Sequence, residues 1–110
     1  MIKPDFFECI EIRMGSPFKA CNLRLVGEWA PELPYETWQD VWATSKDKRI
    51  LGLIAWDIDE KNNPGFRIVV VNERKRTITT SDRIPGCCLS ISWEGSGFKY
   101  ETSGWLPYRT

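Results

Sequence analysis

A run of oxygen-bearing side chains between two apolar stretches is the first candidate for chemistry in this sequence. Asp57 and Asp59 lie two positions apart in the sequence and are followed by Lys61 and two asparagines. Hard cations favour closely spaced oxygen ligands, so the spacing invites comparison with a calcium-binding loop. The comparison fails at Lys61, which stands where an oxygen ligand belongs, and at Ile68, which replaces the bidentate glutamate of such loops. We therefore favour a solvated hairpin turn, because Asp, Asn and Gly are common turn formers.

Four cysteines supply the second kind of metal ligand: Cys9, Cys21, Cys87 and Cys88. The N-terminal residues show no apolar run of a secretory signal, so we expect reduced thiols that pack as small buried hydrophobes. The spacing contains no C-x-x-C unit, and adjacent residues of a strand face opposite sides, which separates Cys87 from Cys88. A sulfur-rich zinc site stays open if Cys9 or Cys21 meets one of them in space.

Histidine is absent from the sequence. This removes the side chain that titrates near neutrality, and with it the Ser-His-Asp and Cys-His arrangements of familiar hydrolases. A cysteine or serine nucleophile would need a lysine or carboxylate as its base, and no spacing aligns such a pair. A carboxylate pair drawn from Glu8, Glu11, Asp57 and Asp59 would depend on the tertiary structure. We expect a protein that is not an enzyme, with no catalytic residue, metal or cofactor.

The charges of the chain balance. Fifteen Lys and Arg residues match fifteen Asp and Glu residues in 110 residues, so no global field favours nucleic acid or an anionic membrane. Arg74, Lys75 and Arg76 form a short basic cluster beside Glu73, and we interpret it as a solvated turn. No stretch approaches the roughly 20 apolar residues that cross a bilayer. We expect a cytoplasmic protein whose partner is neither nucleic acid nor membrane.

The candidate sites considered above assign no role to the six tryptophans of the sequence. Tryptophan is enriched at binding hot spots because it buries a large area and keeps a polar N–H group. We select Trp29, Trp38 and Trp105 as candidate protein-binding residues, and expect Trp29 and Trp105 to be partly exposed. Packing in the core is the alternative for each of them, and for Trp38 and Trp42 it is the simpler interpretation.

Apolar and polar residues alternate along most of the chain, which is typical of half-buried strands. The segment from Ile50 to Ile58 is apolar on both faces and predicts a central strand that is covered on two sides. Turn formers separate the apolar runs and predict antiparallel connections between neighbours. The predicted strands are Phe6–Met14, Lys19–Trp29, Ile50–Ile58, Phe66–Val71, Arg76–Thr80, Cys88–Trp93 and Gly97–Thr102.

One segment shows a different spacing. Trp38, Val41 and Trp42 recur at intervals typical of a helix, after a loop that contains two prolines. The spacing predicts one short helix over Glu36–Ala43, docked on the sheet through its two aromatic side chains.

Two parts of the sequence share a pattern. Ile54-Ala55-Trp56-Asp57 and the later Gly65-Phe66-Arg67 match Ile91-Ser92-Trp93-Glu94 and the later Gly97-Phe98-Lys99. Together with the turn-like start at Trp42, residues 42–102 loosely resemble a β-propeller blade-like repeat. The resemblance implies an antiparallel meander, although a closed propeller needs more blades than 110 residues supply.

These observations predict a single mainly β domain over residues 1–110. We expect an antiparallel meander of about seven strands, sandwich-like or strongly twisted, with one short helix. The function that fits best is a non-enzymatic protein-binding module of a regulatory, inhibitor or immunity type, which needs a rigid complementary surface. One alternative is a small zinc-, calcium- or ligand-binding domain. Another is a self-assembling homo-oligomer, because an open meander has strand edges that can pair with copies of themselves.

Overall fold

The computed structural model describes residues 2–12, 18–61 and 63–102. Within these ranges the chain forms strands and turns, and no helix. The strands are β1 (Lys3–Glu11), β2 (Lys19–Val26), β3 (Trp38–Thr44), β4 (Ile50–Trp56), β5 (Gly65–Asn72), β6 (Thr77–Thr80), β7 (Ile84–Pro85), β8 (Cys88–Glu94) and β9 (Gly97–Thr102).

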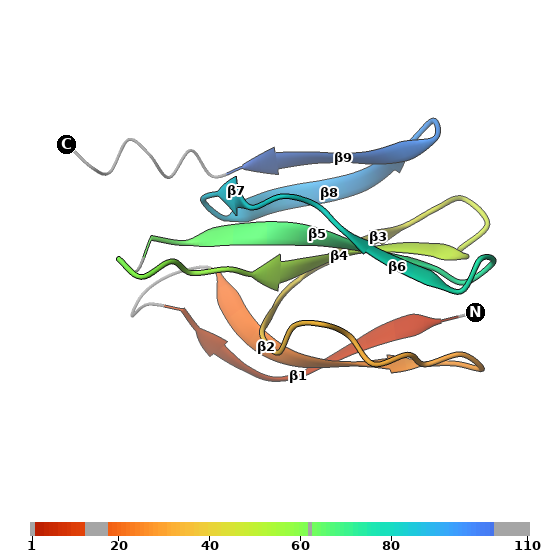
Figure 1. The fold of residues 1–110 in the computed structure, drawn as a ribbon, viewed down its shortest axis with the longest axis horizontal. Coiled ribbons are helices and arrows are strands. Elements are labelled where there is room, and N and C mark those ends of the chain that lie inside the picture. Colours follow the sequence, from red (N-terminus) through yellow and green to blue (C-terminus); the bar gives the residue numbers. More distant parts are fainter. Residues whose placement is uncertain (1, 13–17, 62, 103–110) are drawn as a thin grey trace.

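The strands build three layers (Figure 1). Strands β3 to β6 form the middle layer as an antiparallel meander, and β7 continues along the same edge of β5 as β6. The β1–β2 hairpin covers one face of this layer, and the β8–β9 hairpin covers the other. Strand β2 meets β3 in one residue pair, Cys21 with Trp38, so the first hairpin can leave the plane of the sheet and fold over its face.

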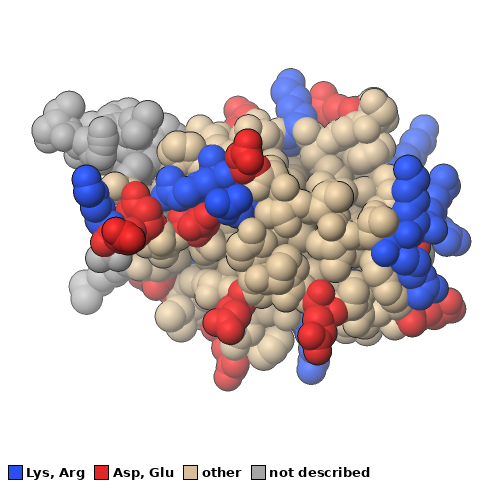
Figure 2. Space-filling model, in the orientation of Figure 1, with Lys and Arg blue, Asp and Glu red and all other residues tan. Residues whose placement is uncertain are grey.

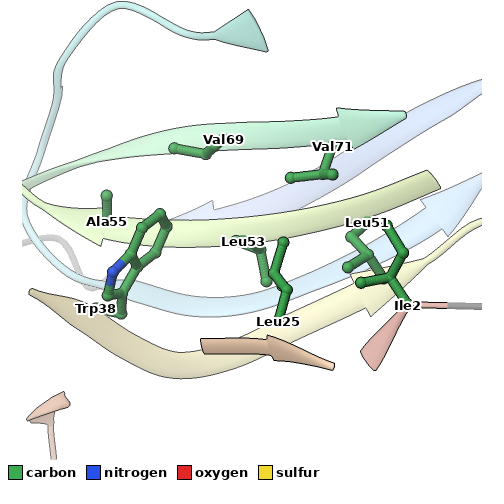
Figure 3. Packing of buried hydrophobic residues seen from close by; sticks show 8 residues of the cluster. All are labelled: Ile2, Leu25, Trp38, Leu51, Leu53, Ala55, Val69 and Val71. Carbon is green, nitrogen blue, oxygen red and sulfur yellow. The ribbon is translucent and has the colours of Figure 1, made fainter. Parts of the chain in front are cut away.

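The first hydrophobic core lies between the β1–β2 hairpin and the middle layer (Figure 3). Side chains alternate along a strand, so every second residue of β4 and β5 points to this face. At about 25 cal/mol per Å² of buried apolar surface, such a core is the main source of folding stability. Its buried members are Ile2, Leu25, Trp38, Leu51, Leu53, Ala55, Val69 and Val71.

The second core lies on the opposite face of β4 and β5, beneath the β8–β9 hairpin. Gly52 of β4 makes room there, because a Cβ at this position would lie 2.9 Å from Cε1 of Phe98. The aromatic ring of β9 therefore rests directly on the backbone of the middle sheet. The buried members of this core are Ile54, Phe66, Ile68, Cys88 and Ile91.

The mainly β antiparallel meander is confirmed. Every residue of β4 from Leu51 to Trp56 is buried, as predicted for a central strand between two layers. The two predicted outer hairpins are also present, one at each end of the described chain.

The predicted helix over Glu36–Ala43 is wrong, because Trp38–Thr44 forms strand β3. Trp38 pairs with Ala55, and Trp42 pairs with Leu53. Between these two pairs β3 contains two more residues than β4, which is a β-bulge. On the strand Trp38 packs in the first core and Val41 against the second, so the i, i+3 spacing that predicted a shared helix face instead places them on opposite faces. The described chain also lacks any helix long and apolar enough to span a membrane.

A second irregularity changes β1. The pairing with β2 shifts between Phe7 and Ile10, and Glu8 has a positive φ of 52°. Simple alternation predicts a buried Ile10, but beyond the bulge its side chain is 68% exposed.

The same bulge positions a disulfide bond. Cys9 lies opposite Cys21 with 4.1 Å between the Cα atoms, and the two sulfur atoms are bonded. The expectation of four reduced thiols is therefore wrong for this pair, since the bulge, which alternation does not reveal, brings the two residues together. Cys87 and Cys88 are buried thiols, as predicted.

Candidate functional site

A groove runs between the outer edge of the middle sheet and the tip of the β8–β9 hairpin. Its volume is about 470 Å³, and most of its lining is apolar. We call it the β6–β9 groove. Its lining residues are Ile50, Ile68, Val70, Asn72, Thr79, Thr80, Ser81, Trp93, Ser96, Gly97 and Phe98.

Two aromatic side chains form one wall of the β6–β9 groove. Trp93 and Phe98 face each other across the β8–β9 hairpin, with ring centroids 5.0 Å apart and planes at 76°. This edge-to-face geometry is favourable for aromatic rings. Both rings are half-buried, because Phe98 rests on Gly52 while part of each ring borders the groove.

Strand β6 forms the opposite side of the groove, and its outer edge is open. Among the described strands, β6 pairs with β5 alone. The N–H group of Ser81 donates to the carbonyl of Ile68 at 2.9 Å. This bond determines which residues of β6 direct their backbone groups toward β5. Because inward and outward groups alternate in an antiparallel pair, the N–H and C=O groups of Ile78 and Thr80 point away from β5.

The open edge of β6 also lacks the protection that edge strands usually carry. Its sequence is Thr-Ile-Thr-Thr, without proline or charge. Charged side chains and proline normally block the pairing of an edge with another chain. Strand β1 contains Pro4 and a bulge among its acidic residues, and β9 contains Lys99 and Glu101. Strand β6 is therefore the most receptive of these three strands to a further strand.

The polar side chains of Ser81 and Asn72 in the groove form hydrogen bonds with nearby backbone groups. The Ser81 hydroxyl accepts from the N–H of Ile68 at 2.9 Å and donates to the carbonyl of Asp82 at 2.8 Å. The Asn72 side chain accepts from the N–H of Lys75 at 3.1 Å. None of the lining residues ionises near neutral pH. The groove can thus offer apolar contact and hydrogen bonds, and its lining contains no pair of a nucleophile and a base.

The structure separates the three tryptophans selected from the sequence. Trp29 is half-buried against the first core, and the Arg76 guanidinium lies 5.3 Å from the centre of its ring. Trp38 is 1% exposed, because its ring fills the first core beneath the β1–β2 hairpin, so it is not available to a partner. Trp105 lies outside the described residues. The three do not form one described surface.

The predicted turn at Asp57 and Asp59 is held by two arginines. The Arg67 Nε lies 2.7 Å from the Asp57 carboxylate, and Arg83 lies 3.9 Å from the same carboxylate and 4.0 Å from Asp59. Arg83 also donates to the backbone carbonyls of Asp57 at 3.0 Å and Asn63 at 2.9 Å. The cations that balance these carboxylates are therefore side chains of the protein.

The carboxylate of Asp59 is further occupied by its own turn. It accepts from the N–H groups of Lys61 and Asn63, each at 2.9 Å. The hydrogen bond from the Asn63 backbone is the main cause that lowers the pKa of Asp59. In the described part of the chain, no three Cys, Asp or Glu side chains are grouped so that they could hold a metal ion.

Sequence reasoning did not select the aromatic pair of the groove, although the pattern shared by residues 54–67 and 91–99 contained the signal. In the first copy of the pattern Trp56 pairs with Phe66 across β4 and β5, and in the second Trp93 pairs with Phe98 across β8 and β9. In the first pair Phe66 lies beneath the β8–β9 hairpin, and the Trp56 indole N–H donates to the Lys19 carbonyl of β2 at 2.8 Å, so both rings are buried. The two rings of the second pair are half-buried and border the groove. The sequence pattern contains both Trp–Phe pairs, and the packing of the layers determines which pair is accessible.

Comparison with family models, with curated proteins and with solved structures found no match.

Proposed function

We propose that this protein is a non-enzymatic binding module that receives an extended segment of another protein along β6. The observation that carries the proposal is the open, uncharged edge of β6 beside the aromatic wall of Trp93 and Phe98. A strand added to a sheet edge gains affinity from main-chain hydrogen bonds and specificity from pockets for alternate side chains. The β6–β9 groove supplies both elements.

The backbone of β6 can recognise such a segment without side chains. Ile78 and Thr80 together present two outward N–H donors and two outward C=O acceptors. Side chains of the added strand that point to the face of the β8–β9 hairpin would lie over Thr79 and next to Trp93. Aromatic side chains are frequent centres of binding energy because they bury a large area.

The rest of the fold makes this edge rigid. Two cores fix β5, the neighbour of β6, from both faces. A preformed surface loses little entropy on binding, which suits a regulatory, inhibitor or immunity-type protein. The inhibitor-like role remains our proposal for the class of this module.

Self-assembly is the second candidate, and the same open edge favours it. Two copies could pair β6 with β6 in an antiparallel, twofold arrangement. Light scattering across a concentration series separates the candidates, because self-pairing predicts a dimer whose fraction rises with concentration.

The proposal can be tested with a display library of random ten-residue peptides. We expect selected peptides to shift the amide NMR signals of Ile78 and Thr80 and the indole signal of Trp93. Thr80→Pro removes an outward N–H without removing a bond to β5, so it should weaken binding at least tenfold. Thr80→Val keeps the N–H and is the matched control. Selection of no peptide, or binding that Thr80→Pro leaves unchanged, would refute the proposal.

A further inference from the structure

Two turns gather basic side chains at one end of the molecule. The β3–β4 turn carries Lys46, Lys48 and Arg49, and the β5–β6 turn carries residues 74–76, all of them exposed. Six basic and two acidic side chains leave these turns with a net formal charge of +4 in a chain of zero net charge. Figure 2 shows the Lys and Arg side chains clustered at that end, on the right. We call residues 46–49 and 73–76 the basic end.

Backbone and side-chain contacts join the two turns into one surface. The N–H of Glu73 donates to the carbonyl of Arg49 at 2.8 Å, and Arg74 forms an ion pair with Asp47. Asp47 also accepts from the Ser45 hydroxyl at 2.7 Å, the main cause that lowers its pKa. The Asp47 carboxylate thus serves to hold the β3–β4 turn, and the basic side chains of both turns are exposed.

The basic end adjoins the open strand edge. Strand β6 begins at Thr77, directly after Arg76, so a segment that pairs with β6 would have one end beside Lys75. We propose that the segment bound by β6 is acidic at the end that lies beside the β5–β6 turn. This inference rests on the proposed function and specifies the chemistry of the partner.

The direction of pairing determines which end is acidic. Every strand pair of the middle sheet is antiparallel, and antiparallel pairing is slightly more stable per residue than parallel pairing. In an antiparallel complex the C-terminal end of the bound segment lies beside Thr77 and the basic end. We therefore assign Asp or Glu residues to the C-terminal end of the segment.

A protein segment fits the charges better than a nucleic acid does. Residues 25–45 contain four acidic residues and no Lys or Arg, and Trp29 of this segment lies beneath Arg76 of the basic end. A long polyanion that reached the basic end would approach Glu28 as well, and it would be repelled. A short acidic terminus meets the positive charge alone.

The test uses the peptides selected from the ten-residue library. We expect Asp and Glu to be enriched in their last three positions. Lys75→Glu should weaken binding roughly tenfold at low salt, since it reverses a charge beside the bound terminus, and added salt should reduce the difference. Lys61→Glu makes the same charge change on the Asp57–Asn63 loop, away from the basic end, and should leave binding unchanged.

Each failure has a separate signature. Peptides that Thr80→Pro weakens but that show no acidic bias and no response to Lys75→Glu would overturn this inference and leave the proposed function in place. If no peptide depends on Thr80, the proposed function fails and the inference fails with it. Tight binding of single-stranded DNA that Lys75→Glu abolishes and Thr80→Pro leaves intact would assign the basic end to polyanions and also overturn the inference.

Discussion

The side-chain amide of Gln39 forms two hydrogen bonds with the backbone of Cys88 inside the protein. Its Nε2 donates to the Cys88 carbonyl, and the Cys88 N–H donates to its Oε1 at 3.2 Å. Strands β3 and β8 belong to different sheets, so no backbone ladder joins them. One glutamine side chain therefore takes the place of a ladder and fixes the β8–β9 hairpin, which carries Trp93 and Phe98.

Replacing Gln39 by methionine should destabilise the fold. The change keeps the volume and leaves the buried N–H and C=O groups of Cys88 without these partners, at a cost of about 2 kcal/mol. Urea unfolding at equilibrium measures the free energy of unfolding. Asp40→Asn, at an exposed neighbour, is the control and should change it by less than about 0.5 kcal/mol. A Gln39→Met value as small as the control would show that this pair does not fasten the hairpin.

Gly52→Ala should disturb the groove from beneath. The added Cβ would lie 2.9 Å from Cε1 of Phe98 and 3.1 Å from Cδ1 of Ile91, so the hairpin must shift, at about 1–3 kcal/mol. Gly97→Ala is the matched control, because a Cβ there has no heavy atom within 4 Å. Thermal unfolding and the indole NMR signal of Trp93 report the two effects. Equal melting temperatures for both variants would contradict the packing of Phe98 on β4.

The Cys9–Cys21 disulfide should contribute to stability. It closes a short loop, and the loss of such a cross-link costs about 3 kcal/mol in the chain-entropy description. We expect the double variant Cys9→Ser, Cys21→Ser to unfold at lower urea concentration than the oxidised protein. Thiol titration of the unreduced protein in denaturant should find two reactive groups, and four would show that the bond is absent.

Cys88 should be unreactive in the folded protein. Burial raises the pKa of its thiol to about 11, and the thiol donates to the Ser90 carbonyl at 3.3 Å. At pH 8 only roughly one molecule in a thousand carries the thiolate that reacts with iodoacetamide. Mass spectrometry should find alkylated Cys88 only after denaturant is added. Rapid alkylation at pH 8 without denaturant would contradict the burial of this residue.

The same pKa predicts a loss of stability in alkaline solution. The folded state holds the Cys88 proton more tightly than the unfolded state, whose thiol titrates near 9. This contribution to stability is therefore complete below about pH 9 and declines as the pH rises toward 11. Unfolding midpoints at pH 7, 9 and 10.5 should show the decline, and Cys88→Ala should reduce it.

Arg83 should contribute more than an exposed arginine does. Its guanidinium bridges the carbonyls of Asp57 and Asn63 and lies over Gly65, where an added Cβ would be within 2.4 Å of it. We expect Arg83→Ala to lower the free energy of unfolding by about 1–2 kcal/mol. Arg24→Ala removes an exposed pair with Asp5 and should cost less than about 1 kcal/mol. Similar losses in both variants would argue against a bridging role for Arg83.

The sequence predicted those elements whose signal is local. The two-sided apolar run of β4, the polar turn after Asp57 and the final hairpin follow from alternation and turn chemistry, which act between near neighbours. The pattern shared by residues 54–67 and 91–99 likewise corresponds to two hairpins, each with a Trp–Phe pair. Alternation failed at the bulge of β1, where an extra residue shifts the register and Ile10 turns to solvent. The helix-like spacing of Trp38 and Val41 was misleading, because on β3 these side chains point to opposite faces.

Only the tertiary structure determined which side chains are exposed and where charges gather on the surface. Trp38 and Trp93 are both tryptophans on strands, yet the β1–β2 hairpin covers the first, while the second borders the groove. The basic end and the Cys9–Cys21 bond each join residues from two parts of the chain. Local sequence determines which face of a strand is apolar, because side chains alternate, but exposure and charge depend on which strand lies on top, and that is a property of long-range packing.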